Sequence, residues 1–149
     1  MQKLNQISIF NRFTEDELQV LTANMKFFEV SKGKVLFREG DKGDYICFVV
    51  DGRLDVIKRT FLREEIIINT LSRGQSFGEM SIIENSPRSA TVKAATKTAL
   101  FTLTREDFDR IMQDYPHIGT KILKGIALLL SRKLRQTSSR LIDYMATRT

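Results

Sequence analysis

Residues 77–92, FGEMSIIENSPRSATV, place a glycine, an acid, an apolar run, a polar turn, a proline and a base in one short segment. Gly78 follows an apolar strand end, where the absence of a side chain lets the backbone approach a ligand closely. We expect residues 79–83 to form one helical turn, whose unpaired N–H groups suit an anion. Pro87 then ends the segment, so Arg88 begins the next strand.

The polar residues of this segment suit two different chemical groups. Arg88 offers a planar fork of donors that matches two phosphate oxygens, and Ser89 adds a hydroxyl and a backbone N–H. Glu79 only accepts hydrogen bonds when ionised, so it suits a sugar hydroxyl. The segment therefore predicts a site for one ligand with a phosphate and a ribose. The residues alone leave a second interpretation open, in which Glu79 and Arg88 form a salt bridge that ties two strands together.

The composition is that of an ordinary soluble globular protein, with 149 residues, 42% hydrophobic and 28% charged. This length fits one domain with a substantial core. No apolar run approaches the ~20 residues of a membrane span, and the N-terminus lacks the layout of a signal peptide. The one cysteine, Cys47, lies in the apolar run YICFVV and is expected to be buried and unreactive. We therefore expect a cytoplasmic protein.

The net charge of +6 lies entirely in residues 116–149, which hold seven Lys or Arg side chains and the single acid Asp143. Residues 1–115 hold 17 side chains of each sign. Such a basic segment suits contact with nucleic acid or an acidic partner, or it forms a solvated basic face. We favour the solvated face.

The order of short apolar runs and turns indicates a mainly β protein with flanking helices. Between residues 26 and 103, seven or eight β-branched or aromatic runs alternate with turn sequences rich in glycine. This spacing favours a sandwich or barrel over a doubly wound sheet. Thr14 and Thr104 are expected to cap helices that begin just after them. Pro116 precedes a long helix at about residues 117–146.

The long helix carries two apolar stripes. One is a heptad seam, formed by Leu123, Ala127, Leu130, Leu134, Thr137, Leu141 and Tyr144. The other runs through the first half only and consists of Ile118, Ile122, Ile126 and Leu129. We interpret the second stripe as packing on the β-structure and the seam as a helix pair that makes a homodimer through residues 117–146. The alternative is that both stripes face one core.

The sequence offers little for catalysis. The single histidine, His117, has no partner at the spacing of metal ligands, so no metal site is predicted. No serine lies in the sequence context of a nucleophile elbow. We therefore predict that the protein is not an enzyme.

The segment FGEMSIIENSPRSATVKA resembles the phosphate-binding cassette of the cyclic-nucleotide-binding domain family. The matching positions are Phe77, Gly78, Glu79, Ser81, Ile82, Arg88, Ser89, Ala90, Val92 and Ala94. The upstream stretch VLFREGDKGDYICFVVDG resembles a second signature of the family, with Gly40, Asp41, Gly43 and Gly52 in place. It departs from that signature at Phe37 and Cys47, which we read as packing variation. The likeness spans almost the whole chain.

The resemblance implies an eight-stranded jelly-roll β-barrel with an N-terminal helix and C-terminal helices that move on ligand binding. It implies a single domain over residues 1–149, with the roll at about 26–103 and the hinge and dimer helices at about 104–146. Glu79 would bind the ribose 2′-hydroxyl, while Arg88, Ser89 and the backbone of Gly78 would bind the cyclic phosphate. The residues implied to contact the ligand are Phe77, Gly78, Glu79, Met80, Ser81, Arg88, Ser89, Ala90, Thr137 and Ser138.

The choice of base is also implied by resemblance. A threonine often follows the arginine in cGMP-selective members, whereas this chain has Ser89, as in the cAMP-binding catabolite activator proteins. The stretch SRKLRQTSSRL resembles the part of those proteins where a Thr-Ser pair contacts adenine, in one case from the partner subunit. The match falls on Thr137 and Ser138 and favours cAMP as the ligand, with cGMP as the alternative.

The expected mechanism is that the turn at 79–83 and Arg88 draw in around the phosphate. This shift would free a hinge near residues 108–116, and the final helix would then close over the base. The activators continue into a winged helix that reads DNA, which this sequence does not include, so nucleic-acid binding is not expected here.

Three kinds of output are open: a stand-alone sensor with an unknown protein partner, the sensor half of a transcription factor, or the regulatory module of a channel or kinase. An interpretation from another class is a structural β-roll dimer with a non-functional cassette.

Overall fold

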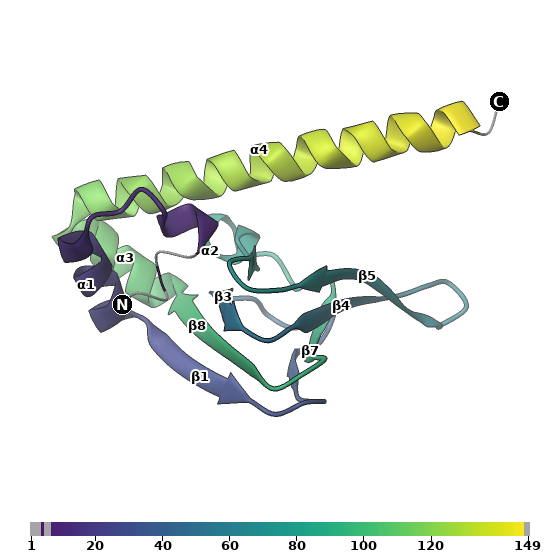
Figure 1. The fold of residues 1–149 in the computed structure, drawn as a ribbon, viewed down its shortest axis with the longest axis horizontal. Helices are drawn as coiled ribbons and strands as arrows, with labels where there is room; N and C mark the ends of the chain where they lie inside the picture. The colour runs from purple at the N-terminus through teal and green to yellow at the C-terminus, as the bar shows by residue number, and fades with distance from the viewer. Residues whose placement is uncertain (1–3, 5–6, 148–149) are drawn as a thin grey trace.

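The computed structural model describes residue 4 and residues 7–147 and shows a β-roll flanked at one end by helices (Figure 1). A short 3-10 helix, η2 (Ser8–Phe10), and α1 (Glu15–Asn24) come before the strands. The strands and the short helix among them are β1 (Lys26–Val30), β2 (Val35–Phe37), β3 (Tyr45–Asp51), β4 (Leu54–Arg59), β5 (Glu65–Leu71), β6 (Ser76–Phe77), α2 (Met80–Ile83), β7 (Thr91–Ala94) and β8 (Thr98–Thr104). Two helices follow, α3 (Arg105–Asp114) and α4 (Pro116–Thr147).

The predicted helix caps are confirmed. The Thr14 hydroxyl accepts a hydrogen bond from the Glu17 N–H, and the Glu17 side chain accepts one from the Thr14 N–H, which completes a capping box. The Thr104 hydroxyl accepts from the N–H of Asp107 and starts α3. These local bonds explain why both helices begin where the sequence predicts.

The strands form two antiparallel sheets with the orders β1-β8-β3-β6 and β2-β7-β4-β5. Their facing surfaces enclose an apolar core that includes Cys47, Val49, Leu54 and Val92, all fully buried. This arrangement confirms the eight-stranded jelly roll. It differs from the prediction in one respect, because no strand ladder joins the two sheets within the part of the chain that the structure describes, so the roll is not a closed barrel.

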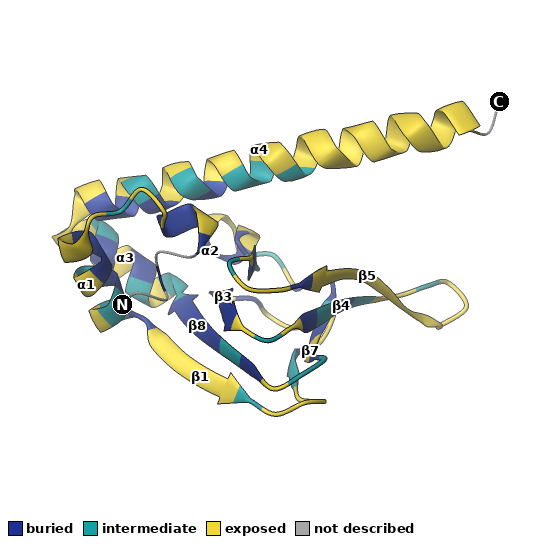
Figure 2. Cartoon of the chain, viewed as in Figure 1, coloured by how far each residue is buried: buried dark blue, intermediate teal, exposed yellow. Residues whose placement is uncertain are grey.

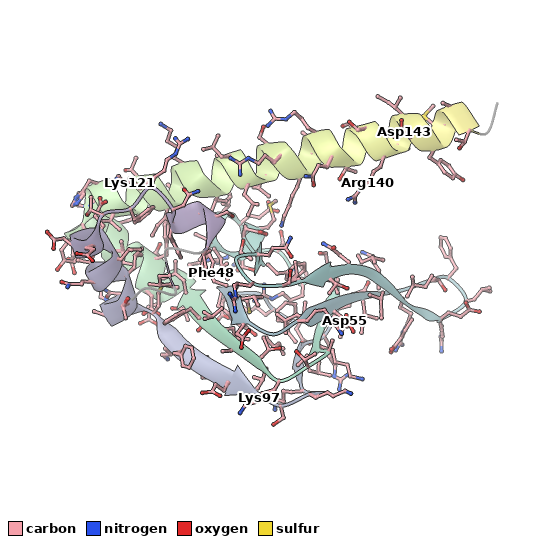
Figure 3. All side chains as sticks on the ribbon, in the orientation of Figure 1. Phe48, Asp55, Lys97, Lys121, Arg140 and Asp143 are labelled. Carbon is pink, nitrogen blue, oxygen red and sulfur yellow. The ribbon has the colours of Figure 1, made fainter. Side chains whose placement is uncertain are left out.

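A second apolar core lies where the helices meet the first sheet. Phe48 of β3, labelled in Figure 3, is fully buried there. Its ring centroid lies 4.9 Å from that of Phe10. From α4, the side chains of Ile118, Ile122 and Ile126 are all buried in this core. The prediction that the second stripe packs on the β-structure is therefore confirmed in part, because the stripe enters a core that β3 and β8 also line, while α4 lies mainly against α3 and η2.

The second half of α4 runs above β5 and β4 in this view, and nearly all of it is exposed (Figure 2). Arg140 and Asp143 lie on this half of the helix (Figure 3). The exposed apolar side chains here are Leu134, Leu141, Ile142, Tyr144 and Met145. The C-terminal part of the heptad seam is thus unburied within a single chain. No helix among the described residues is long and apolar enough to cross a membrane.

Candidate functional site

The cassette begins with a glycine that no other residue replaces without strain. Gly78 joins β6 to α2 with φ +91°, a left-handed conformation that side chains with a Cβ rarely adopt. A Cβ added at this position would lie 2.4 Å from Nη1 of Arg88. The glycine therefore lets the backbone turn directly beneath the guanidinium group.

Arg88 is the buried cation of the site, with 5% of its surface exposed. Nη1 donates a hydrogen bond to the Ser81 hydroxyl at 2.9 Å, and Nη2 donates to the Tyr45 carbonyl at 2.7 Å. The guanidinium carbon also lies 4.0 Å from the ring centroid of Phe37 and 4.6 Å from that of Tyr45. Two of the five N–H donors are thus in use, and the buried Nε has no acceptor among the described residues.

The loop before β3 closes over Arg88 from the other side. The Arg88 N–H donates to the Asp41 carbonyl at 2.7 Å, and the Arg88 carbonyl accepts from the Gly40 N–H at 2.8 Å. A Cβ on Gly43 would lie 3.0 Å from Nε of Arg88 and 2.7 Å from the Ser81 hydroxyl. These contacts join the two glycine-containing signatures of the sequence into one site around the arginine.

Glu79 is also buried, but it does not pair with Arg88. Its Oε1 accepts a hydrogen bond from Lys133 Nζ at 2.7 Å and another from the Ser76 hydroxyl at 3.2 Å. No ion pair joins Glu79 to Arg88, and the structure describes both residues. The alternative interpretation, in which the two residues tie the strands together, is therefore wrong. The acid and the base therefore have separate partners, Ser76 and Lys133 for Glu79 and Ser81 and Tyr45 for Arg88.

Lys133 is the residue that the sequence analysis missed. It comes from α4 and reaches the cassette across 54 positions of the chain. Its side chain is 42% exposed, whereas that of Glu79 is 5% exposed, so the cation caps the carboxylate from the solvent side. The sequence did indicate that Lys133 lies near the site, because it is one helical turn before Thr137 in the stretch SRKLRQTSSRL.

The other predicted ligand residues lie at different depths. Ser81 and Ala90 are buried, Phe77 is half-buried, and Met80, Ser89, Thr137 and Ser138 are exposed. A hollow of about 100 Å³ is lined by residues 77–81 and 86–89. Thr137 and Ser138 are not among its lining residues. The contact with α4 in this structure is made one turn earlier, by Lys133.

A second arginine links the cassette to the C-terminal helices. Arg105, the first residue of α3, donates from Nε to the Ser81 carbonyl at 3.0 Å and also from Nη2 to the same oxygen. Nη2 donates to the Glu84 carbonyl at 2.7 Å, and Nη1 donates to the Asn85 side chain at 2.8 Å. Arg105 thus joins the start of α3 to the end of α2 and the turn that follows it.

The remaining candidates for chemistry are structural. Burial raises the pKa of the Cys47 thiol to about 12, so the thiol stays protonated near neutral pH. His117 is exposed at the start of α4. Within residue 4 and residues 7–147 there is no group of three or more His, Cys, Asp or Glu side chains placed to hold a metal ion.

Comparison with known proteins gives a match over most of the roll. The family model described as "Cyclic nucleotide-binding domain" matches residues 27–115. A cAMP-dependent protein kinase regulatory subunit from Blastocladiella emersonii is 35% identical over 107 residues. The alignment covers 72% of this chain but only 27% of that protein, so this chain spans about a quarter of the relative's length.

Solved structures extend the similarity to α4. A cyclic nucleotide-binding domain from Methylobacillus flagellatus superposes with a TM-score of 0.85 at 29% identity, covering 96% of this chain and 80% of that one. The Thermus thermophilus catabolite activator protein superposes with a TM-score of 0.81 at 27% identity, covering 93% of this chain and 63% of that one. Both similarities include nearly all of this chain.

Proposed function

The chain belongs to the cyclic nucleotide-binding domain family, and from this premise we propose that it binds cAMP as a non-enzymatic regulatory module. The observation that carries the proposal is the state of Arg88. This buried guanidinium retains three unused N–H donors and lines a hollow together with Glu79, whose carboxylate pairs with Lys133 and Ser76 and makes no ion pair with Arg88. A ligand with a phosphate and a ribose matches both groups.

The ligand would lie across α2. Its cyclic phosphate would accept from Arg88, from the Ser89 N–H and from the N–H groups at the start of α2. The ribose 2′-hydroxyl would donate to Glu79, whose Oε2 has no hydrogen-bond partner among the described residues. The hollow of about 100 Å³ is smaller than the ~300 Å³ at which small-molecule pockets begin. The base would therefore extend out of it toward α4.

Two observations favour cAMP over cGMP. Ser89 stands where cGMP-selective members often have a threonine, and the B. emersonii relative is named as cAMP-dependent. Thr137 and Ser138 would contact the adenine once α4 has moved by about one turn relative to the cassette. Their exposure in this structure leaves both hydroxyls free for such a contact.

Binding would be relayed through two contacts that leave the cassette. The first is Glu79–Lys133, because a ribose hydroxyl at Glu79 changes the environment of the α4 lysine. The second is the grip of Arg105 on the end of α2. Since a ligand shifts an equilibrium only through its different affinities for the two states, these contacts must differ between the free and bound forms.

We further propose that residues 1–149 act as one unit and that α4 forms a homodimer. The exposed apolar side chains of α4 after Lys133 are the surface that this pairing would cover. The proposed outputs are those named above: a sensor that acts through a protein partner, the sensor half of a transcription factor, or the regulatory module of a channel or kinase. Sedimentation velocity of the wild type and of Leu141→Glu tests the dimer. A monomer at both low and high micromolar concentration of the wild type would exclude it.

Calorimetric titration with cAMP and cGMP tests the proposed function. At 100 times Kd, cAMP is expected to raise the free energy of unfolding by ~2.7 kcal/mol, and Arg88→Ala is expected to remove most of this gain. The matched control is Arg110→Ala, which changes an exposed arginine of α3. If millimolar cAMP and cGMP both leave the melting temperature of the wild type unchanged, the cassette is not a nucleotide site. The structural dimer with a non-functional cassette would then be the remaining interpretation.

A further inference from the structure

The unclosed edge of the roll contains a second cavity, separate from the nucleotide cassette. It is a slot of about 330 Å³ between the inner face of β1 and β8 and strand β2. Its apolar walls are formed by Phe28, Val30, Val35, Leu36 and Leu100. This volume falls within the range of ~300–1,000 Å³ that is usual for small-molecule pockets. The slot exists because no strand ladder closes β1 against β2 in the described part of the chain.

Two lysines line the slot, Lys26 and Lys34, and three further polar residues, Tyr45, Thr102 and Thr104, lie close to Lys26. Lys26 pairs in register with Thr102, and Tyr45 pairs in register with Thr104, so these four residues lie together. Thr102 is 7% exposed, and its hydroxyl makes no hydrogen bond to any residue that the structure describes. The Lys26 ammonium likewise forms no ion pair within residue 4 and residues 7–147. A hydroxyl without a hydrogen-bond partner and a cation without an ion pair thus lie together beside the apolar walls of the slot.

The geometry points to a binding site for an aliphatic carboxylate, with its head group at Lys26 and Thr102 and its chain between Phe28 and Leu36. A carboxylate accepts from both the ammonium and the hydroxyl, and its charge makes the bond to Lys26 stronger than a neutral oxygen would, whereas an ammonium head group would be repelled by Lys26. The volume corresponds to on the order of ten non-hydrogen atoms, since one water occupies about 30 Å³. An acid of about eight carbons therefore fits the slot.

The slot also touches the nucleotide cassette through one residue. Tyr45 lines the slot, its carbonyl accepts from Nη2 of Arg88, and its ring lies under the same guanidinium. Burial raises the pKa of the Tyr45 hydroxyl to about 12, so the ring faces the slot as a neutral phenol near neutral pH. An acid bound in the slot would therefore affect Arg88 through Tyr45, whose carbonyl and ring both contact the guanidinium group. This coupling rests on the proposed function, whereas binding in the slot does not.

The test is calorimetric titration of the full chain, without nucleotide, with hexanoate, octanoate, decanoate, 1-octanol and octylamine. Affinity is expected to rise about fourfold per methylene from hexanoate to octanoate and to level off at decanoate, because the slot is then full. Octanoate is expected to bind at least tenfold more tightly than octanol or octylamine. In methyl-labelled protein, the resonances of Val35, Leu36 and Leu100 should shift on addition of octanoate.

Three variants locate the head group and the chain. Lys26→Gln is expected to remove the preference for octanoate over octanol, whereas Lys32→Gln, an exposed lysine outside the slot, is expected to keep it. Val35→Phe should fill the slot and abolish binding of every probe. Lys34 also lines the slot, so loss of the preference in Lys34→Gln but not in Lys26→Gln would overturn the assigned head-group position.

The inference as a whole is overturned if octanoate binds no better than hexanoate, or if the wild type and the folded Val35→Phe variant bind octanoate equally. Folding of each variant is checked by circular dichroism and thermal melting. The coupling is tested separately by titrating cAMP with and without saturating octanoate, because reciprocal linkage requires each ligand to change the affinity of the other by the same factor. An unchanged cAMP affinity refutes the coupling, while absence of cAMP binding refutes the proposed function and leaves the slot result unaffected.

Discussion

Replacing Arg88 by lysine keeps the positive charge of the cassette but removes its fork of donors. The guanidinium uses two N–H groups on Ser81 and Tyr45, and three remain for a phosphate. A lysine has three donors around one nitrogen, so contacts to Ser81 and Tyr45 leave it a single N–H for the ligand. The variant therefore loses at least one charge-assisted hydrogen bond to the phosphate.

The size of the effect follows from that bond. A hydrogen bond to a charged group contributes about 1.5–3 kcal/mol, so the affinity for cAMP should fall about 10- to 150-fold. The retained charge explains why we expect a smaller loss of affinity than for Arg88→Ala, which is expected to remove most of the stabilisation by cAMP. The folded state should be less affected, because the lysine still lies over the faces of Phe37 and Tyr45.

The assay is displacement of a fluorescent cyclic nucleotide at constant ionic strength, with a thermal melt of each variant. Arg110→Lys is the matched control, since this arginine lies on α3 and pairs with Asp107. Its cAMP affinity should equal that of the wild type. A folded Arg88→Lys variant that binds cAMP within twofold of the wild type would refute the assignment of the phosphate to Arg88.

Three further outcomes are expected. Gly78→Ala should lose about 1–2 kcal/mol of stability because of its left-handed backbone, and it should also lose nucleotide affinity. Gly33→Ala, which has φ +90° and open space around it, should lose stability alone. Equal nucleotide affinities in the two variants would contradict the proposed close approach of the ligand to Gly78. Lys133→Met should destabilise the fold by about 1 kcal/mol at pH 7, because it removes the cation beside the buried Glu79 carboxylate. If a denaturant titration shows no change in stability, the Lys133–Glu79 pair is not formed in solution. Cys47 should react with a thiol reagent at pH 8 only as fast as the protein unfolds, because burial keeps its thiol protonated and inaccessible. Reaction at the rate of a free thiol would show that the roll opens in the native state.

Much of the fold was predictable because its signals are local. The caps at Thr14 and Thr104 depend on residues three positions away, and the strands are marked by β-branched runs between turns. The two stripes of α4 were also separable by helical periodicity, and the stripe that was expected to pack on the fold is buried. The closure of the roll was not predictable, because strand pairing between sheets is a property of twist and register over the whole chain.

The candidate site also has one part that local sequence predicts and another part that only tertiary contacts determine. The sequence determined the cassette as a unit, because Gly78, Glu79 and Arg88 lie within eleven positions and their chemistry suits a phosphate and a ribose without knowledge of their neighbours. Only the tertiary structure decided which groups these residues touch. It separated Glu79 from Arg88 by bringing Lys133 to the acid across 54 positions and the Tyr45 carbonyl to the base across 43. The physical reason is that a side chain's partner depends on where distant elements cross, and the local periodicities of a sequence carry no information about those crossings.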